Sequence, residues 1–198
     1  MENQTDDLPS WTLWLLSPTR RLFNFLATHR NVQIGPWSWW FLAVNTAFLL
    51  FLSPRLRTAD FWYGPVVLIW LVPYSRIFEI GYAFYNDSID HLKVKPMRSG
   101  LRRHERLKLL GRSYIEVAIC FASLYVVLPW NTFNHQNLNP FEALYFSWIT
   151  ITTTGLGDIF PVSTAAKCLC MVEIGIGIML LVLAVGTYFS YEEPDVAA

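Results

Sequence analysis

Four apolar stretches, separated by polar or charged segments, constrain what this chain can fold into. They cover residues 37–53, 61–85, 114–130 and 165–190. A helix needs about 20 apolar residues to cross the hydrocarbon core of a bilayer. The first stretch is short by this measure, and the second is interrupted by Pro73, Arg76 and Glu79. The pattern predicts an all-α membrane protein with four transmembrane helices, the first two forming a hairpin over residues 36–87.

The composition and the placement of charge agree with a multi-pass membrane protein. Charged residues make up 15% of the chain, against about 25% in typical soluble domains. Eight of the 15 Lys and Arg lie between Lys93 and Arg112, between the second and third apolar stretches. Cytoplasmic loops carry an excess of such residues. We therefore expect residues 88–112 to form a basic cytoplasmic linker, with both termini also in the cytoplasm, although Arg55 and Arg57 then lie outside against the rule.

Residues 1–35 are expected to form a cytoplasmic segment of a different kind. Ser17 and Pro18 match a helix N-cap followed by Pro at the first helical position. The residues that follow combine an apolar face with arginines, which is typical of a helix lying in the membrane interface. A cytosolic helix packed against the linker is the other interpretation. No basic, cleavable signal segment is evident at the start of the sequence.

A shorter segment between the last two apolar stretches carries the candidate site. Residues 140–152 are too short to span a bilayer, and Pro140 and Glu142 fit the first turn of a helix. The loop that follows reads Thr153, Thr154, Gly155, Leu156, Gly157 and Asp158. Irregular backbone at membrane depth is tolerated only where protein or a water-filled cavity surrounds it. The segment therefore predicts a re-entrant helix followed by a loop on the outer side of the membrane.

The glycines of this loop permit a backbone whose carbonyl groups face one axis, and a ring of such carbonyls can replace the hydration shell of K⁺. The loop resembles the TVGYG selectivity filter of the potassium-channel pore-domain family. The resemblance extends over the predicted pore domain, residues 113–192. It implies a filter made by Thr153, Thr154, Gly155, Leu156 and Gly157, with K⁺ bound at the first four. It also implies that the protein is located in a cell membrane, namely the inner membrane of a prokaryote.

The same resemblance assigns supporting roles to neighbouring residues. Asp158 and the aromatic pair Tyr145 and Phe146 would brace the filter, with the Tyr145 hydroxyl donating to Asp158; an unbonded, solvated Asp158 is the other interpretation. On the last helix, Gly177 falls at the position of a hinge glycine and Gly175 lies close by. Apolar side chains of an inner gate would follow, or would simply pack: Ile178, Leu181, Val185 and Phe189.

Two residues depart from the TVGYG pattern. Thr154 replaces Val, and its hydroxyl must find a hydrogen-bond partner behind the filter. Leu156 replaces Tyr and lacks the phenolic hydroxyl that braces the filter in relatives. If selectivity depends on a stiff ring of carbonyls, Leu156 weakens the preference for K⁺ over Na⁺; if carbonyl number and field strength decide, the change matters little.

One loop per chain implies a homotetramer, because the filter needs four strands of carbonyls. We expect a potassium-channel subunit with K⁺ as its permeant ion and no other cofactor. The alternatives are a weakly selective monovalent cation channel, a transport subunit, and a non-conducting regulatory subunit with a vestigial filter. The sequence carries no HExxH, GxSxG, phosphate-binding or dinucleotide motif, so an enzyme is not expected. The basic linker predicts contact with anionic lipid and not with nucleic acid.

The apolar stretches also contain ionisable side chains and cysteines, whose roles need to be assigned. Arg76 and Glu79 are three residues apart and can pair with each other or with Glu116, as a structural ion pair and not as a voltage sensor. Glu173 lies deep in the last stretch, and three interpretations are open: pairing with a Thr hydroxyl at the rear of the pore helix, titration with pH as a gating group, or a buried hydrogen-bonded packing residue. The three cysteines are expected to be packing residues and not metal ligands: Cys120, Cys168 and Cys170.

Overall fold

The computed structural model describes residues 34–52, 70–92, 103–129, 131–135 and 137–189, which form a helical bundle without a β-sheet. Within these ranges, two helical segments are long and apolar enough to cross a membrane: Leu107–Val127 and Thr164–Leu183. A third apolar helical segment, Trp39–Phe51, is shorter. The predicted interfacial helix, the turn with Arg55 and Arg57, and most of the basic linker lie outside the described residues.

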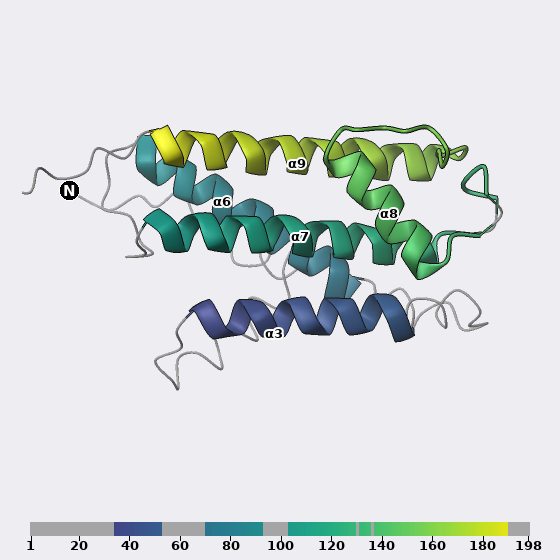
Figure 1. Ribbon diagram of the computed structural model, residues 1–198, viewed down its shortest axis with the longest axis horizontal. Coiled ribbons are helices and arrows are strands. Elements are labelled where there is room, and N and C mark those ends of the chain that lie inside the picture. The colour runs from purple at the N-terminus through teal and green to yellow at the C-terminus, as the bar shows by residue number, and fades with distance from the viewer. Residues whose placement is uncertain (1–33, 53–69, 93–102, 130, 136, 190–198) are drawn as a thin grey trace, which may run out of the picture.

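The helices alternate in direction along the bundle. Helix α3 (Ile34–Ala47) continues into the π-helical turn η1 (Phe48–Leu52), and the turn η2 (Trp70–Tyr74) precedes α6 (Ser75–Leu92). They are followed by α7 (Arg103–Val127), α8 (Pro140–Ile151) and α9 (Thr164–Phe189). In Figure 1, α3 and α7 run in one direction and α6 and α9 in the other, while the short α8 lies between α7 and α9 at one end.

The helix boundaries follow the predicted ones closely in the first and last apolar stretches, but differ in the second and third. Helix α6 continues to Leu92, past residue 85 and into the predicted linker. Helix α7 begins at Arg103, so the last part of the predicted linker is continuous with the third apolar stretch. The many Arg, Lys, Leu and Glu residues there are good helix formers, which explains the extension. In the second stretch, Pro73 lies inside η2 and the regular helix starts only at Ser75, because Pro disrupts the hydrogen-bond ladder of a helix interior.

Helix α7 is the centre of the bundle and contacts α3, α6, α8 and α9. Its small residues Ala118, Cys120 and Ala122 are fully buried, which lets neighbouring helices approach closely. Of the α7 span, 61% is buried, but of the more apolar α9 span only 28%. The most apolar helix therefore presents most of its surface outside its own chain.

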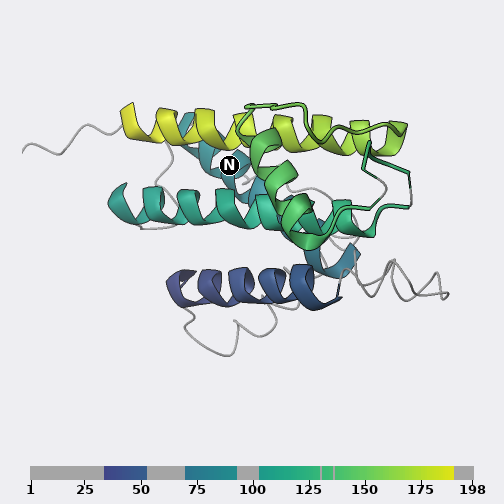
Figure 2. The same cartoon turned by 45° about the vertical axis from the view of Figure 1, so that its right-hand side comes forward.

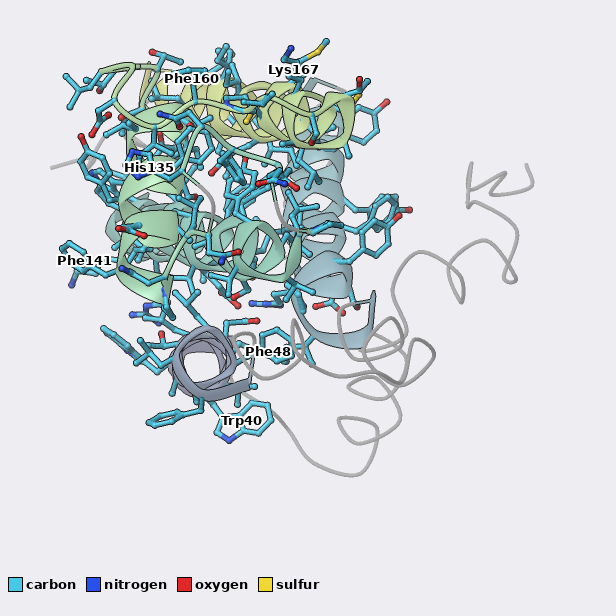
Figure 3. All side chains as sticks on the ribbon, turned by 90° about the vertical axis from the view of Figure 1, so that its right-hand side faces the viewer. Trp40, Phe48, His135, Phe141, Phe160 and Lys167 are labelled. Atoms are coloured by element: carbon cyan, nitrogen blue, oxygen red, sulfur yellow. The ribbon has the colours of Figure 1, made fainter. Side chains whose placement is uncertain are left out.

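Helix α3 packs on α7 through one face only. Figure 3 shows Trp40 pointing away from the other helices, whereas Phe48 lies between α3 and the rest of the bundle. Their exposed fractions agree, at 55% and 6%. The guanidinium of Arg112 lies 4.0 Å from the centroid of the Trp39 ring, a cation–π contact between α7 and α3.

A buried cluster of charges joins α3, α6 and α7. Arg76 donates to both carboxylate oxygens of Glu116, with Nε 2.6 Å from Oε1 and Nη2 3.2 Å from Oε2. Its Nη1 lies 2.9 Å from Oε2 of Glu79. The Asn45 amide also donates to Glu116, at 3.1 Å. This geometry confirms the predicted ion pair, and it uses both predicted carboxylates at once.

Candidate selectivity filter

Helix α8 begins with a complete capping box. The Asn139 side chain accepts from the Glu142 backbone amide, and Glu142 Oε2 accepts from the Asn139 amide, both at 2.9 Å. Pro140 occupies the first turn, where no backbone donor is needed. The sequence pattern places Pro140 and Glu142 in this first turn, and the structure adds Asn139 as the cap. The signal that reveals it is an Asn followed by Glu three residues later.

The chain enters and leaves this region at the same end of the bundle. Helix α8 has 12 residues, so it is about 18 Å long and covers only part of a bilayer core of ~30 Å. From its inner end, residues 152–163, here called the glycine loop, return to the end at which α8 began (Figures 1 and 2). The helix and loop thus have the re-entrant path that the sequence predicts.

The backbone of the glycine loop alternates in handedness. Thr153, Gly155 and Gly157 have positive φ angles of 56°, 54° and 79°, whereas Thr154 and Leu156 between them do not. Such alternation turns successive carbonyl groups towards the same side of the chain. Glycine adopts these angles readily, but a β-branched residue such as Thr153 does so at a cost of roughly 1–3 kcal/mol. Strain of this kind is concentrated at functional sites.

The inner end of the glycine loop is hydrogen-bonded to the last turn of α8. The amides of Thr154 and Gly155 both donate to the Ile149 carbonyl, at 2.9 and 3.2 Å, and the Thr153 amide donates to Thr150. The Thr154 hydroxyl lies 2.9 Å from that of Thr152, which supplies the polar partner that Thr154 needs. The position of α8 therefore sets the position of this backbone directly.

Asp158 lies in the glycine loop, outside both candidate spans, and bonds to Tyr145 on α8. The hydrogen bond from the Tyr145 hydroxyl lowers the pKa of the Asp158 carboxyl, with a smaller contribution from the charge of nearby His135. The structure thus brings together the two side chains that the resemblance pairs. Phe146 is placed differently: it is buried, and its ring centroid is 5.1 Å from those of both Tyr125 and Phe133.

The outer end of the glycine loop is clamped by residues that precede α8. The Asn134 side-chain amide donates to the Asp158 carbonyl at 2.7 Å, and its Oδ1 accepts from the Phe160 amide at 2.8 Å. Phe133 and Pro161 form an isolated antiparallel β-bridge. Figure 3 looks onto this end of the bundle, where His135 and Phe160 are labelled. The role of Asn134 is not evident from the sequence, because no local pattern marks a contact formed across 24 residues.

Comparison with known proteins supports the resemblance of this segment to channel proteins. A family model described as an ion channel matches residues 113–193. The match covers most of α7 and all of α8, the glycine loop and α9, which are together called the pore domain below.

Two curated relatives carry potassium-channel names. TWiK family of potassium channels protein 9 of Caenorhabditis elegans is 44% identical over 45 residues, which is 23% of this chain and 8% of the relative. Potassium channel K1 of Plasmodium berghei is 32% identical over 68 residues, which is 33% of this chain and 4% of the relative. The similarity to these relatives therefore covers a small part of their length. No solved structure matches this chain.

Behind the glycine loop, three helices of the pore domain meet at Glu173. The carboxyl group of this α9 residue accepts from the Tyr125 hydroxyl of α7 at 2.6 Å, and it also bonds to the Ser147 hydroxyl of α8. Ser147 Oγ in turn lies 2.8 Å from the Ala118 carbonyl. Glu173 is thus the buried, hydrogen-bonded residue that the sequence allowed, and it faces α8. Its hydroxyl partners are a Ser and a Tyr and not a Thr, because those residues face α9 at this depth.

The two candidate hinge glycines of α9 have different surroundings. A Cβ atom on Gly177 would lie 2.7 Å from Cγ1 of Ile151 and 3.0 Å from its carbonyl oxygen, whereas one on Gly175 would meet nothing within 4 Å. Gly177 thus allows α9 to touch the end of α8. Ser163 caps the start of α9 by accepting from the Ala166 amide at 3.2 Å.

The predicted inner gate is described only in part. The side chains of Ile178 and Leu181 are about half exposed, on a face of α9 that its own chain does not cover. The side chains of Val185 and Phe189 lie outside the described residues. A gate at these four positions stays a prediction.

Proposed function

We propose that four copies of this chain form a channel that conducts K⁺ passively through filters made by residues 153–157. The observation that carries the proposal is the alternating backbone of the glycine loop, suspended from a re-entrant helix. Carbonyl oxygens of Thr153, Thr154, Gly155 and Leu156 replace the hydration shell of the ion, and K⁺ is the transported species. Asp158 and Tyr145 stabilise the outer part of the loop through their hydrogen bond.

The uncovered apolar surface of the pore domain supports assembly. A single loop cannot surround an ion, so the carbonyls of one chain need those of others. The large apolar side chains exposed on α8, the glycine loop and α9 offer the contact surface: Phe141, Trp148, Phe160, Val162, Met171, Val172, Ile178, Leu181 and Val182. In a fourfold assembly these side chains contact neighbouring subunits, lipid or the ion path. The homotetramer accounts for a highly apolar α9 that is poorly covered by its own chain.

The proposed topology places the filter at the outer surface of a cell membrane. Figure 1 shows that α6 ends and α7 begins at the end of the bundle opposite to the glycine loop. The basic residues between these helices are then cytoplasmic, next to anionic lipid headgroups. Four crossings follow if η1 and η2 extend the two shorter N-terminal helices. A prokaryotic inner membrane stays a prediction.

A weakly selective cation channel is a second candidate, and Leu156 is the observation that favours it. Its side chain is 64% exposed and carries no hydroxyl that could hold the filter laterally. A filter that is not held from the side can contract around Na⁺ when K⁺ is scarce. This candidate shares the pore and the tetramer, and differs only in the permeability ratio.

Flux measurements on the purified chain in liposomes test both candidates. We expect K⁺ and Rb⁺ to pass faster than Na⁺, and Gly157→Ala to abolish the flux, because its φ of 79° strains any residue with a Cβ. Gly175→Ala is the matched control, since a Cβ there meets nothing within its own chain. Chemical cross-linking in the same liposomes should give a tetramer.

The remaining outcomes separate the alternatives. Equal Na⁺ and K⁺ fluxes would establish the weakly selective channel, and Leu156→Tyr should then restore discrimination. No cation flux from folded tetramers would overturn the channel and leave a non-conducting subunit.

A further inference from the structure

Glu173 is a fully buried carboxyl group that has no cationic partner among the described residues. Its residue exposure is 0%, at the junction of α7, α8 and α9. Within the described part of the chain, the ion pairs join Arg76 to Glu79 and Glu116, and none involves Glu173. The titratable side chains that face it are Tyr125 and Tyr114 of α7 and Cys170 of α9 itself. An ionised carboxylate in such surroundings is costly to bury.

Counting the protons in this cluster shows which form of Glu173 fits the geometry. Ser147 Oγ lies within hydrogen-bond distance of both Glu173 Oε1 and the Ala118 carbonyl, yet a hydroxyl has a single proton to donate. If Glu173 is ionised, Ser147 can satisfy only one of these acceptors. The other contact then places two oxygens together without a proton between them.

A protonated Glu173 satisfies every contact. Its own proton goes to Ser147 Oγ, the Ser147 proton goes to the Ala118 carbonyl, and Tyr125 donates to Glu173 Oε2. The Tyr125 oxygen also lies 3.5 Å from Cys170 Sγ, whose thiol proton it can accept. Donors and acceptors then match in number, which a buried polar network requires.

This network reaches the glycine loop through α8. Ser147 precedes by two residues Ile149, whose carbonyl holds the amides of Thr154 and Gly155. One helical turn beyond Glu173, Gly177 packs against Ile151 at the end of α8. The two contacts lie four residues apart on α9 and therefore on the same face. Helix α9 thus contacts the half of α8 to which the glycine loop is hydrogen-bonded.

We propose that Glu173 is a positioning residue of the filter: it carries a proton, donates it to Ser147, and fixes α8 against α9. The proposal rests on the proposed function, because it assigns the consequence to ion conduction. A displacement of α9 is then passed to the filter backbone through the Glu173–Ser147 bond, without any side chain of the network touching the ion.

Three substitutions test the positioning role by liposome flux and single-channel recording. Glu173→Gln should keep the K⁺/Na⁺ ratio and open probability, since its amide donates to Ser147 and its carbonyl accepts from Tyr125. Glu173→Asp keeps the acid but is one methylene too short to reach Ser147. Glu173→Asp and Ser147→Ala should each lower the open probability by about tenfold, the factor for one hydrogen bond of ~1.4 kcal/mol.

The infrared spectrum tests the proton independently of conduction. We expect the carbonyl band of a protonated carboxylic acid in the wild-type protein at neutral pH, and its loss in Glu173→Gln. Absence of that band, or full activity of Glu173→Asp with loss of activity in Glu173→Gln, would overturn the proposal. So would unchanged gating and selectivity in folded Ser147→Ala tetramers. A wild-type protein without flux refutes the channel, whereas the band still reports on Glu173.

Discussion

The bundle contains two buried glutamates whose cost of burial is compensated in different ways. Glu116, where α3, α6 and α7 meet, is 1% exposed and receives two hydrogen bonds from the Arg76 guanidinium. Glu173, where α7, α8 and α9 meet, is 0% exposed, and its partners among the described residues are the hydroxyl groups of Tyr125 and Ser147. The first carboxyl is compensated by a charge, and the second by the proton that we propose it carries.

The difference matters because the two kinds of junction respond differently to movement. A buried ion pair is strongly destabilised when one partner is removed, since an uncompensated charge remains. A neutral network loses only individual hydrogen bonds of about 1 kcal/mol each. The Arg76 junction is therefore suited to holding the N-terminal helices rigidly on α7. The Glu173 junction is suited to a contact that can shift beside the glycine loop.

Removing the positive charge of Arg76 should have the largest effect on stability. Arg76→Met leaves Glu116 buried and unpaired, so we expect a loss of about 3–5 kcal/mol in the free energy of unfolding, measured by denaturation in detergent micelles. The double variant Arg76→Met with Glu116→Gln should recover part of this loss, because it removes the orphaned charge. A single variant as stable as the wild type would show that water reaches Glu116.

Neutralising each carboxylate compares the two junctions directly. Glu116→Gln weakens the charged hydrogen bonds from Arg76 and should cost about 2 kcal/mol. Glu173→Gln replaces one neutral group by another and should cost less than about 1 kcal/mol. The measurement is again the free energy of unfolding, on matched preparations. Equal losses of stability in the two variants would show that Glu116 and Glu173 do not differ in this way.

Disturbing the packing between α8 and α9 should have the next largest effect on stability. Gly177→Ala forces a Cβ into Ile151, and we expect a loss of about 1–3 kcal/mol together with altered single-channel gating. Gly175→Ala lies half a turn away in open space and should be neutral or stabilising by up to about 1 kcal/mol. If both variants behave alike, the close contact at Gly177 does not govern the position of α8.

The smallest effect concerns Asp158, an exposed carboxylate that also bonds to a hydroxyl. Because Tyr145 lowers the pKa of Asp158, its stabilisation is complete above the ordinary pKa of Asp and is lost as the pH falls through the lowered value. Tyr145→Phe should raise that pKa, as read from a carboxyl NMR titration. His135→Gln is the control, and its effect should be smaller because the charge of His135 contributes less. A larger shift in His135→Gln would contradict the assigned cause.

What the sequence could predict was local. Pro140 and Glu142 indicate the start of α8, and the glycines indicate the irregular backbone of the loop, because each signal depends on neighbours within one helical turn. The partners of Glu173 could not be predicted, since Tyr125 and Ser147 lie 48 and 26 residues away. Their meeting depends on how three helices are rotated about their axes. Gly177 illustrates the same limit: the sequence suggested a hinge, and only the structure shows its contact with Ile151.

The β-bridge between Phe133 and Pro161 closes the intervening chain into a ring. Its two ends meet, so the segment between them, including α8 and the residues proposed to bind ions, can be exchanged as one unit between two neighbouring positions of the chain. A graft from a relative would fit this scaffold if it brought a hydroxyl at the position of Ser147 and left Tyr125 and Glu173 in place. The bridge thus marks the natural junctions for building chimaeric pores on this scaffold.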